Sequence, residues 1–172
     1  MVAASAHLTD QKDTSARVWQ VLKTVADPEI PVLTIVDLGM ARDVRVDGDE
    51  VVVAITPSYT GCPAMDTIEA DILSALRDQG FDHARVETVL SPAWTTDWMS
   101  ADGRRKLKEY GIAPPPEAGA AKKSLTGQAT VVRCPQCGAS ETECISEFGS
   151  TACKALYRCT VCREPFDHFK CI

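Results

Sequence analysis

Apolar residues recur at helical spacing in two stretches of the chain, and each stretch has its own start and stop signals. The first predicted helix can be capped at Asp13 or Thr14 and must end before Pro28, because proline cannot continue a helix. The second predicted helix starts at Pro63 and ends at Gly80, a glycine in the usual position after a helix. The apolar faces consist of Val18, Val21, Leu22 and Val25 in the first helix, and of Met65, Ile68, Ile72 and Leu76 in the second.

Alternating apolar and polar residues predict two strands at 41–46 and 50–55, joined by a tight turn at Asp47-Gly48-Asp49. A third strand is expected at 84–90, followed by a short helix over 100–110. In chain order these elements read α-β-β-α-β-α. This order predicts a small α+β domain with its helices on one face of a sheet, and it leaves the strand order open.

The amino-acid composition of the chain changes after residue 112. Residues 113–130 are rich in proline, alanine, glycine, lysine and serine and offer little to bury, so they predict a linker. The expected organisation is an α+β domain at 13–112, a linker at 113–130 and a cysteine-rich module at 131–172. Residues 1–12 are expected to be disordered, and they lack the basic segment and apolar core of a signal peptide.

Composition and charge narrow the function classes. The chain is 45% hydrophobic and 24% charged, as in ordinary globular proteins, and no apolar run approaches the roughly 18 residues of a membrane span. Residues 1–110 hold 11 Lys/Arg against 18 Asp/Glu, and residues 131–172 hold five of each. No basic surface is expected, which argues against a nucleic-acid partner. We expect a cytoplasmic protein with no membrane partner; its oligomeric state stays open, with a dimer among the options.

Seven of the eight cysteines lie after residue 133, in a module too short to bury a self-sufficient core. Cys134 and Cys137 form one CxxC pair, followed by a glycine, and Cys159 and Cys162 form a second pair. Four thiolates in two such turns can build a closed tetrahedral zinc site. Because no export signal is present, metal binding is favoured over disulfides, and the module is predicted to be zinc-ribbon-like.

Three further cysteines of this module exceed what one zinc ion requires. A small buried hydrophobic side chain is the favoured interpretation of Cys144. Cys153 and Cys171 could bind partner thiols or a second metal, or replace one of the four, and His168 is a weaker alternative ligand. The strands of the ribbon are expected at 145–148 and 155–157.

Cys62 is the only cysteine before the C-terminal module. It follows a glycine turn and directly precedes Pro63, so it is predicted to lie at or beside the helix N-cap. Unpaired N–H groups and the helix dipole favour an anionic sulfur there, with Asp66 partly opposing them. A structural cysteine acting as a small hydrophobe is an alternative of equal weight.

The segment Asp27-Pro28-Glu29 follows the first predicted helix as a rigid acidic turn. Its sequence alone favours an ordinary helix stop with solvated carboxylates. Paired carboxylates beside a thiol could instead help to hold iron, which accepts both oxygen and sulfur ligands.

The motifs together resemble two known families. Asp27-Pro28-Glu29, the segment Val36-Asp37-Leu38-Gly39-Met40, and Thr60-Gly61-Cys62-Pro63 resemble the iron–sulfur cluster assembly domain of SufT-type proteins. The C-terminal module, with Cys134-Pro135-x-Cys137 and the cysteines up to Cys171, resembles the PaaD family of phenylacetate degradation, also called PaaJ. The resemblance covers residues 14–172.

The resemblance implies an accessory protein and not an enzyme. Cys62 would be the cluster-transfer residue with Asp27 and Glu29 as its acidic turn, and the two CxxC pairs would hold structural zinc. The implied role is assembly of an iron–sulfur or di-iron centre in the phenylacetyl-CoA epoxidase system, a ring-hydroxylating monooxygenase, with iron or a cluster as transient cargo. The partners would be its reductase or di-iron oxygenase subunits. The alternative is a non-catalytic adaptor that docks oxygenase components through the ribbon.

Cysteine hydrolase chemistry would need a histidine beside Cys62, and His83 is the only candidate in that domain.

Overall fold

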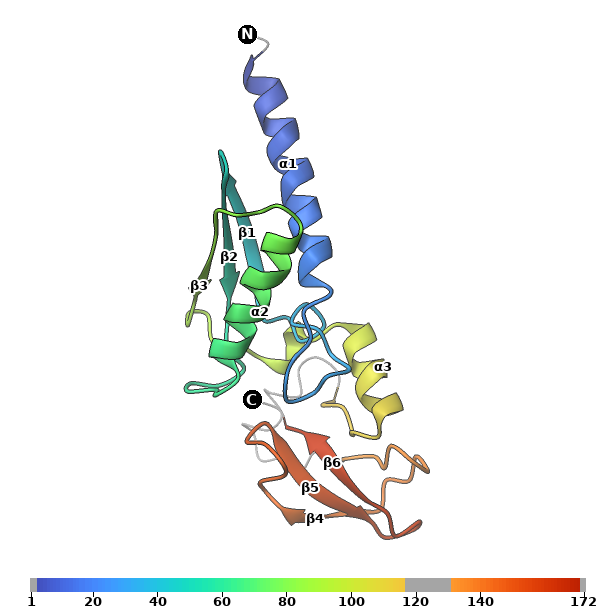
Figure 1. Cartoon of the computed structure of the whole chain (residues 1–172). Helices are drawn as coiled ribbons and strands as arrows, with labels where there is room; N and C mark the ends of the chain where they lie inside the picture. The colour runs from blue at the N-terminus through green and yellow to red at the C-terminus, as the bar shows by residue number, and fades with distance from the viewer. Residues whose placement is uncertain (1–2, 117–130, 171–172) are drawn as a thin grey trace. The chain divides into compact units, whose positions relative to one another are not determined.

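The computed structural model describes residues 3–116 and 131–170, with side chains from residue 11 onward, in two compact units, Met1–Ala93 and Trp94–Ile172 (Figure 1). The last predicted helix of the α+β domain is therefore grouped with the cysteine-rich module. The domain boundaries expected from the sequence, 13–112 and 131–172, stay a prediction about which pieces fold independently. Most of the expected linker, residues 117–130, lies outside the described residues.

The first unit begins with a helix that is longer than the sequence analysis expected. Helix α1 spans Ala3–Leu22, so the expectation of disorder over residues 1–12 and of a cap at Asp13 or Thr14 is wrong from residue 3 onward. The reason lies in composition, because residues 3–12 contain no glycine or proline and include three alanines, the best helix former. The predicted apolar face is confirmed at Val18 and Leu22, which are fully buried.

The predicted hairpin forms the centre of this unit. Strand β1 (Ala41–Asp47) pairs antiparallel with β2 (Glu50–Ile55), and Gly48 takes the positive φ of 59° that the tight turn requires. Strand β3 (Ala84–Thr88) pairs parallel with β2, which gives the order β1-β2-β3. Because β2 and β3 run in the same direction, the helix between them, α2, is a crossover connection (Figure 1).

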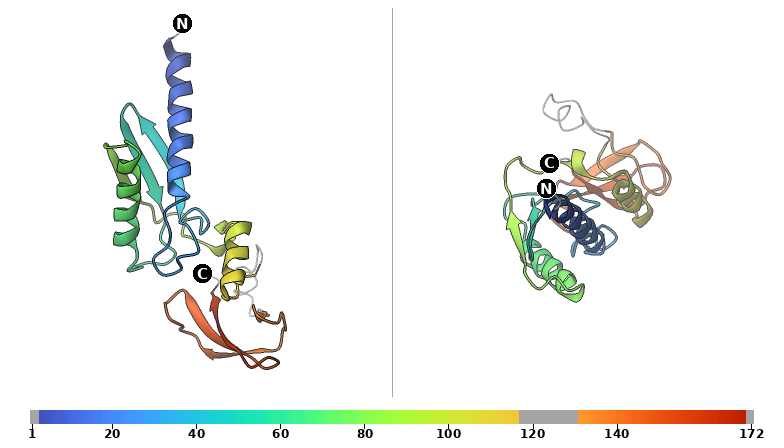
Figure 2. Two further views of the ribbon diagram at one scale, coloured as in Figure 1. Left: turned by 45° about the vertical axis from the view of Figure 1, so that its right-hand side comes forward. Right: turned by 90° about the horizontal axis from the view of Figure 1, so that it is seen from above.

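Helix α2 spans Met65–Asp78 and buries Ile68, Ile72 and Leu76, as its apolar spacing predicted. It packs against β3, helix α1 packs against β1, and the two helices contact each other beside the sheet (Figure 2). The predicted C-terminal glycine is confirmed: Gly80 has a φ of 83° and donates its N–H to Arg77 O at 2.9 Å. These contacts fix the loop before α2, where Cys62 lies.

The second unit combines a helix with a three-stranded sheet. A 3₁₀ turn, η1 (Thr96–Trp98), leads into α3 (Ala101–Tyr110), which Ser100 caps by accepting the N–H of Gly103 at 2.9 Å. The sheet has the order β4-β5-β6, with strands Thr142–Ser146, Lys154–Cys159 and Pro165–Phe169. The sequence predicted strands in the first two regions and missed β6.

Strand β6 carries the core that joins the helical and ribbon parts of this unit. Phe169 is almost fully buried and meets the Trp94 ring edge-on, with centroids 6.2 Å apart. Ala113 donates its N–H to Asp167 O at 2.8 Å and accepts the N–H of Phe169 at 2.9 Å. The segment after α3 therefore extends the ribbon sheet by a bridge, and it is not a free linker at this point. No helix in the described part of the chain is long and apolar enough to cross a bilayer.

Candidate metal centres

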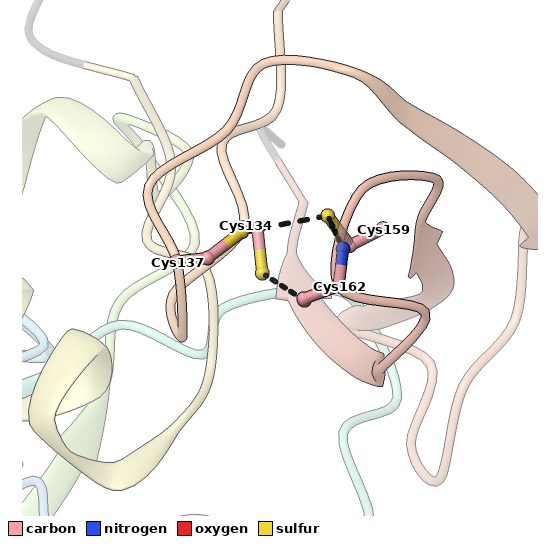
Figure 3. A group of neighbouring side chains, drawn as sticks. All are labelled: Cys134, Cys137, Cys159 and Cys162. Carbon is pink, nitrogen blue, oxygen red and sulfur yellow. Dashed lines mark hydrogen bonds between the residues drawn. The ribbon is translucent and has the colours of Figure 1, made fainter.

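The structure brings the four cysteines of the two CxxC pairs into one cluster (Figure 3). All four sulfur atoms lie within 4.8 Å of one another. The Sγ atoms of Cys134 and Cys162 are 3.7 Å apart, and those of Cys137 and Cys159 are 3.6 Å apart. Sulfurs at about 2.3 Å from a tetrahedral zinc ion lie about 3.8 Å from each other, so this spacing fits zinc.

Each CxxC pair forms a turn that curls the backbone around its sulfurs. In the first turn, Gly138 has a φ of 77° and donates its N–H to Cys134 O at 2.9 Å. The second turn repeats this geometry at Arg163, which has a φ of 69° and donates its N–H to Cys159 O at 3.1 Å. A left-handed conformation at a non-glycine residue costs on the order of 1 kcal/mol, which metal binding readily offsets.

Backbone N–H groups prepare this cluster for a cation. The Cys162 amide donates to Cys159 Sγ at 3.4 Å and, with the amide of Val161, lowers the pKa of Cys159 to about 7. An amide donor at Glu164 also favours the thiolate of Cys162, but desolvation and the neighbouring thiols outweigh it and raise the pKa of Cys162 to about 12. The four thiols cannot all ionise side by side without a metal. Zinc binding replaces their protons and holds the ribbon as a structural ion.

Two of the surplus thiols, those of Cys144 and Cys153, lie outside this cluster. Cys144 is exposed, so its interpretation as a buried hydrophobe was wrong; its Sγ lies 3.8 Å from Glu147 Oε1. Strand β4 is an edge strand of the ribbon sheet, so Cys144 lies at the edge of that sheet. Cys153 is buried, with its Sγ 3.0 Å from Thr151 Oγ1. Cys171 lies outside the described residues. Across residues 11–116 and 131–170, the four CxxC cysteines are the only close group of three or more metal ligands.

His168 is not a ligand in this arrangement. Its Nδ1 lies 3.1 Å from Ala113 O, and its ring meets Tyr157 edge-on at 5.4 Å. Burial lowers the pKa of His168, so the ring is neutral at pH 7 and serves as a packed hydrogen-bonding group.

Cys62 lies in the turn that precedes α2. Its N–H donates to Tyr59 O at 3.2 Å, and its carbonyl accepts the N–H of Met65 at 3.3 Å. The N-cap of α2 is Ala64, so Cys62 lies two residues before the cap and not at it. Pro63 is therefore not the first residue of the helix. It lies in the turn closed by the bond from Met65 N–H to Cys62 O, and α2 begins after this turn.

The environment of Cys62 differs from the anion-stabilising one expected at a helix start. The residue is 8% exposed. Burial raises the pKa of its thiol, and the negative charges of Glu29 and Asp27 raise it further. Hydrogen bonds from the backbone N–H of Ala64 and from the side chain of Tyr59 lower the pKa, but the net pKa of the thiol stays raised. The free thiol is therefore protonated at pH 7.

Both carboxylates of the acidic turn act electrostatically on the Cys62 thiol. Asp27 is buried, and its Oδ1 accepts the backbone N–H groups of Glu29 at 2.9 Å and Ile30 at 2.8 Å. Asp27 thereby builds the turn, whereas Glu29 is half-buried and projects from it. The two acids have different tasks, which the sequence did not separate.

Three further residues, Thr34, Asp37 and Tyr59, form hydrogen bonds in this region, and none of them was among the site residues expected from the sequence. Thr34 and Asp37 bond reciprocally: Asp37 Oδ2 accepts the Thr34 N–H at 3.0 Å, and Thr34 Oγ1 accepts the Asp37 N–H at 3.0 Å. This is the pattern of a capping box, and a Thr-x-x-Asp spacing was the available signal. Tyr59 was visible in the stretch before Cys62, but nothing in sequence indicated that its side chain would bond to the thiol.

Comparisons with known proteins agree with this division of the chain. The family model described as the iron–sulfur cluster assembly protein matches residues 15–90, and the model described as the PaaD zinc beta ribbon domain matches residues 118–170. An Escherichia coli protein named as one subunit of a "Putative 1,2-phenylacetyl-CoA epoxidase" is 52% identical over 155 residues, which cover 90% of this chain and 92% of that protein.

Two other relatives match the first unit. A protein of Porphyromonas gingivalis named "Fe-S protein maturation auxiliary factor" is 33% identical over 96 residues, which cover 55% of this chain and 90% of that protein. The crystal structure of a domain of unknown function, DUF59, from Bacillus anthracis aligns with a TM-score of 0.55 and 27% identity, covering 58% of this chain and 96% of that one. The expected family and the expected α+β fold with a C-terminal zinc ribbon are therefore confirmed.

Proposed function

Because this chain belongs to the PaaD family, together with the Escherichia coli phenylacetyl-CoA epoxidase protein, we propose that it matures a metal centre of that epoxidase. In this proposal the protein is a cytoplasmic accessory factor and not an enzyme. It carries iron or an iron–sulfur cluster at Cys62 and delivers it to the reductase or to the di-iron oxygenase component. The match of its first unit to the iron–sulfur cluster assembly model supports this role.

The observation that carries the proposal is that two carboxylates of the acidic turn, Glu29 and Asp27, act electrostatically on one buried thiol, Cys62. A buried thiol with a raised pKa is a poor nucleophile at pH 7, which disfavours hydrolase chemistry. A metal ion would displace the proton from Cys62, and the same negative charges that oppose a free thiolate would then attract the cation. Iron accepts the mixed sulfur and oxygen ligands that Cys62 and Glu29 offer.

The Cys62 site is incomplete within the first unit, and this supports transient binding. Iron–sulfur clusters usually take four cysteine ligands, and Cys62 is the only cysteine of the first unit. Asp27 Oδ1 already accepts two backbone N–H groups. A bound iron or cluster therefore needs ligands from outside the unit, from a second copy or from the protein that receives it. Incomplete coordination makes release to a recipient easier than a closed site would.

A second candidate is an adaptor that docks oxygenase components through the ribbon, with Cys62 structural. It is favoured by the apolar side chains that the ribbon exposes, since Ile145 is 51% and Phe148 is 70% exposed. Exposed apolar residues of this size often belong to protein interfaces. The two candidates differ in what they require of Cys62.

The deciding experiment replaces the chromosomal copy by Cys62→Ser, with Cys144→Ser as the matched control at an exposed cysteine. The maturation proposal expects the Cys62→Ser strain to lose phenylacetate-dependent growth while its oxygenase components are present but short of iron or cluster. The control strain should grow normally. Normal growth and full metal content in the Cys62→Ser strain would favour the adaptor instead.

A further inference from the structure

The second unit contains a pocket of about 570 Å³ beside the cysteine cluster, and Cys134 is one of its lining residues. Helix α3 contributes Arg104, Arg105 and Lys108 to its wall, and Arg133, the residue before the first CxxC turn, also lines it. The segment Pro114–Pro116 is a further part of the lining. Its volume is in the range of about 300–1,000 Å³ that is typical of ligand sites.

The charges on this wall all have one sign. No aspartate or glutamate is among the described residues that line the pocket. Arg104 is held by three carbonyl oxygens, those of Thr96 at 2.6 Å, Pro115 at 2.6 Å and Pro116 at 2.9 Å. These bonds fix the guanidinium without neutralising its charge. Arg105 differs from Arg104, because ion pairs with Asp102 and Glu109 offset its charge.

Lys108 and Arg133 are the two cations of the pocket that stay available to a ligand. Both are exposed, and neither forms a salt bridge with any residue of the described ranges. The nearest bond of Arg133 is a long one of 3.5 Å to Gly138 O. Two unpaired cations beside the fixed charge of Arg104 attract an anionic group.

With zinc bound, the cysteine cluster would be a further anionic group near this wall, since four thiolates on Zn²⁺ carry a formal charge of about −2. Cys134 lines the pocket, but only 1% of it is exposed, and amide donors already serve the thiolates of the second CxxC turn. The long side chains of Lys108 and Arg133 extend into solvent. They are therefore placed to meet a second anion from outside.

The remaining lining is apolar. Pro114–Pro116 and Pro135 are rigid surfaces, and Val131 is 64% exposed. A small inorganic anion would leave this surface in water. An extended peptide that alternates acidic and apolar side chains would instead pair with the cations and cover the prolines and the valine.

We propose that this pocket, framed by α3 and the first CxxC turn, binds an acidic, apolar-containing segment of a partner protein. The acidic side chains pair with Lys108 and Arg133, and the apolar ones pack on Pro114–Pro116 and Val131. This site lies within the second unit and does not depend on the role of Cys62.

Fluorescence anisotropy on the full zinc-loaded chain tests the proposal. The probe is a short fluorescein-labelled peptide in which glutamate alternates with leucine and proline, and the control peptide has glutamine in place of glutamate. We expect the glutamate peptide to bind and the control peptide to fail. Lys108→Gln and Arg133→Gln should each weaken binding about threefold to fivefold, the effect of one solvent-exposed ion pair. Lys23→Gln, at an exposed lysine of the first unit, should leave it unchanged.

Three results would overturn the proposal. Equal binding of both peptides would show that charge plays no part. Displacement of the labelled peptide by inorganic phosphate, more strongly than salt of the same ionic strength explains, would assign the pocket to a small anion. Loss of zinc from Lys108→Gln and Arg133→Gln, measured in the same samples, would mean that these cations serve the zinc–thiolate group.

Discussion

The carboxylate of Asp27 accepts the backbone N–H of Glu29 at 2.9 Å, so the first acid of the turn holds the second in place beside Cys62. Asp27→Ala removes the acceptor for two backbone N–H groups and should lower stability by about 1–2 kcal/mol, as the loss of a cap does. Asp27→Asn keeps an oxygen acceptor and should recover most of that loss. Glu29→Gln should leave the denaturation midpoint unchanged and reduce only metal delivery. Equal stability losses at both positions would contradict this division.

The raised pKa of Cys62 predicts slow alkylation near pH 7. Only the thiolate reacts, so the alkylation rate of Cys62 should rise about tenfold per pH unit up to the pKa of its thiol. Since the charge of Glu29 raises this pKa, Glu29→Gln should lower it and speed the reaction at fixed pH. The exposed Cys144 should react faster than the buried Cys62 at pH 7, because the reagent reaches its sulfur directly. Peptide mapping after iodoacetamide treatment gives both rates; a slower reaction in Glu29→Gln would refute the electrostatic explanation.

The zinc ribbon should not survive the loss of one ligand. We expect one zinc ion per chain, held by the four clustered cysteines. Structural zinc contributes on the order of 10 kcal/mol, as much as a small domain's whole stability. Cys137→Ser should release zinc and make residues 131–170 sensitive to protease, with Cys144→Ser as the control. Full zinc content in Cys137→Ser would show that the assignment is wrong.

Trp94 should stabilise the second unit and not the first. It is buried and packs edge-on against Phe169 in β6. Trp94→Ala should cost the ribbon unit about 3–5 kcal/mol through loss of a large buried side chain. A fragment of residues 1–93 should still unfold cooperatively, because its core is complete without Trp94. If that fragment is unfolded while residues 1–112 are folded, the boundary expected from the sequence is the correct one.

The sequence predicted the local elements well where periodicity was strong. The apolar faces of α1 and α2, the hairpin at Asp47-Gly48-Asp49 and the four clustered cysteines were all readable, because each depends on spacing alone. The extension of α1 to Ala3 was missed because weak propensity without an apolar face gives little signal.

Features that depend on tertiary contacts were not predictable. Strand β6 alternates buried Phe166 and His168, but a proline and two charged residues surround this short run and masked it. The burial of Cys62 depends on how the whole unit packs, which no local pattern encodes. The partnership of α3 with the ribbon depends on the bridge between Ala113 and His168, 55 residues apart.

Iron and acid-labile sulfide analysis of the protein, purified without oxygen from cells growing on phenylacetate, tests most directly whether Cys62 carries the cargo. We expect iron in the wild type and in Cys144→Ser, its loss in Cys62→Ser, and unchanged zinc in all three. Equal iron in Cys62→Ser and the wild type, or zinc alone in every sample, would contradict the claim that Cys62 carries the cargo.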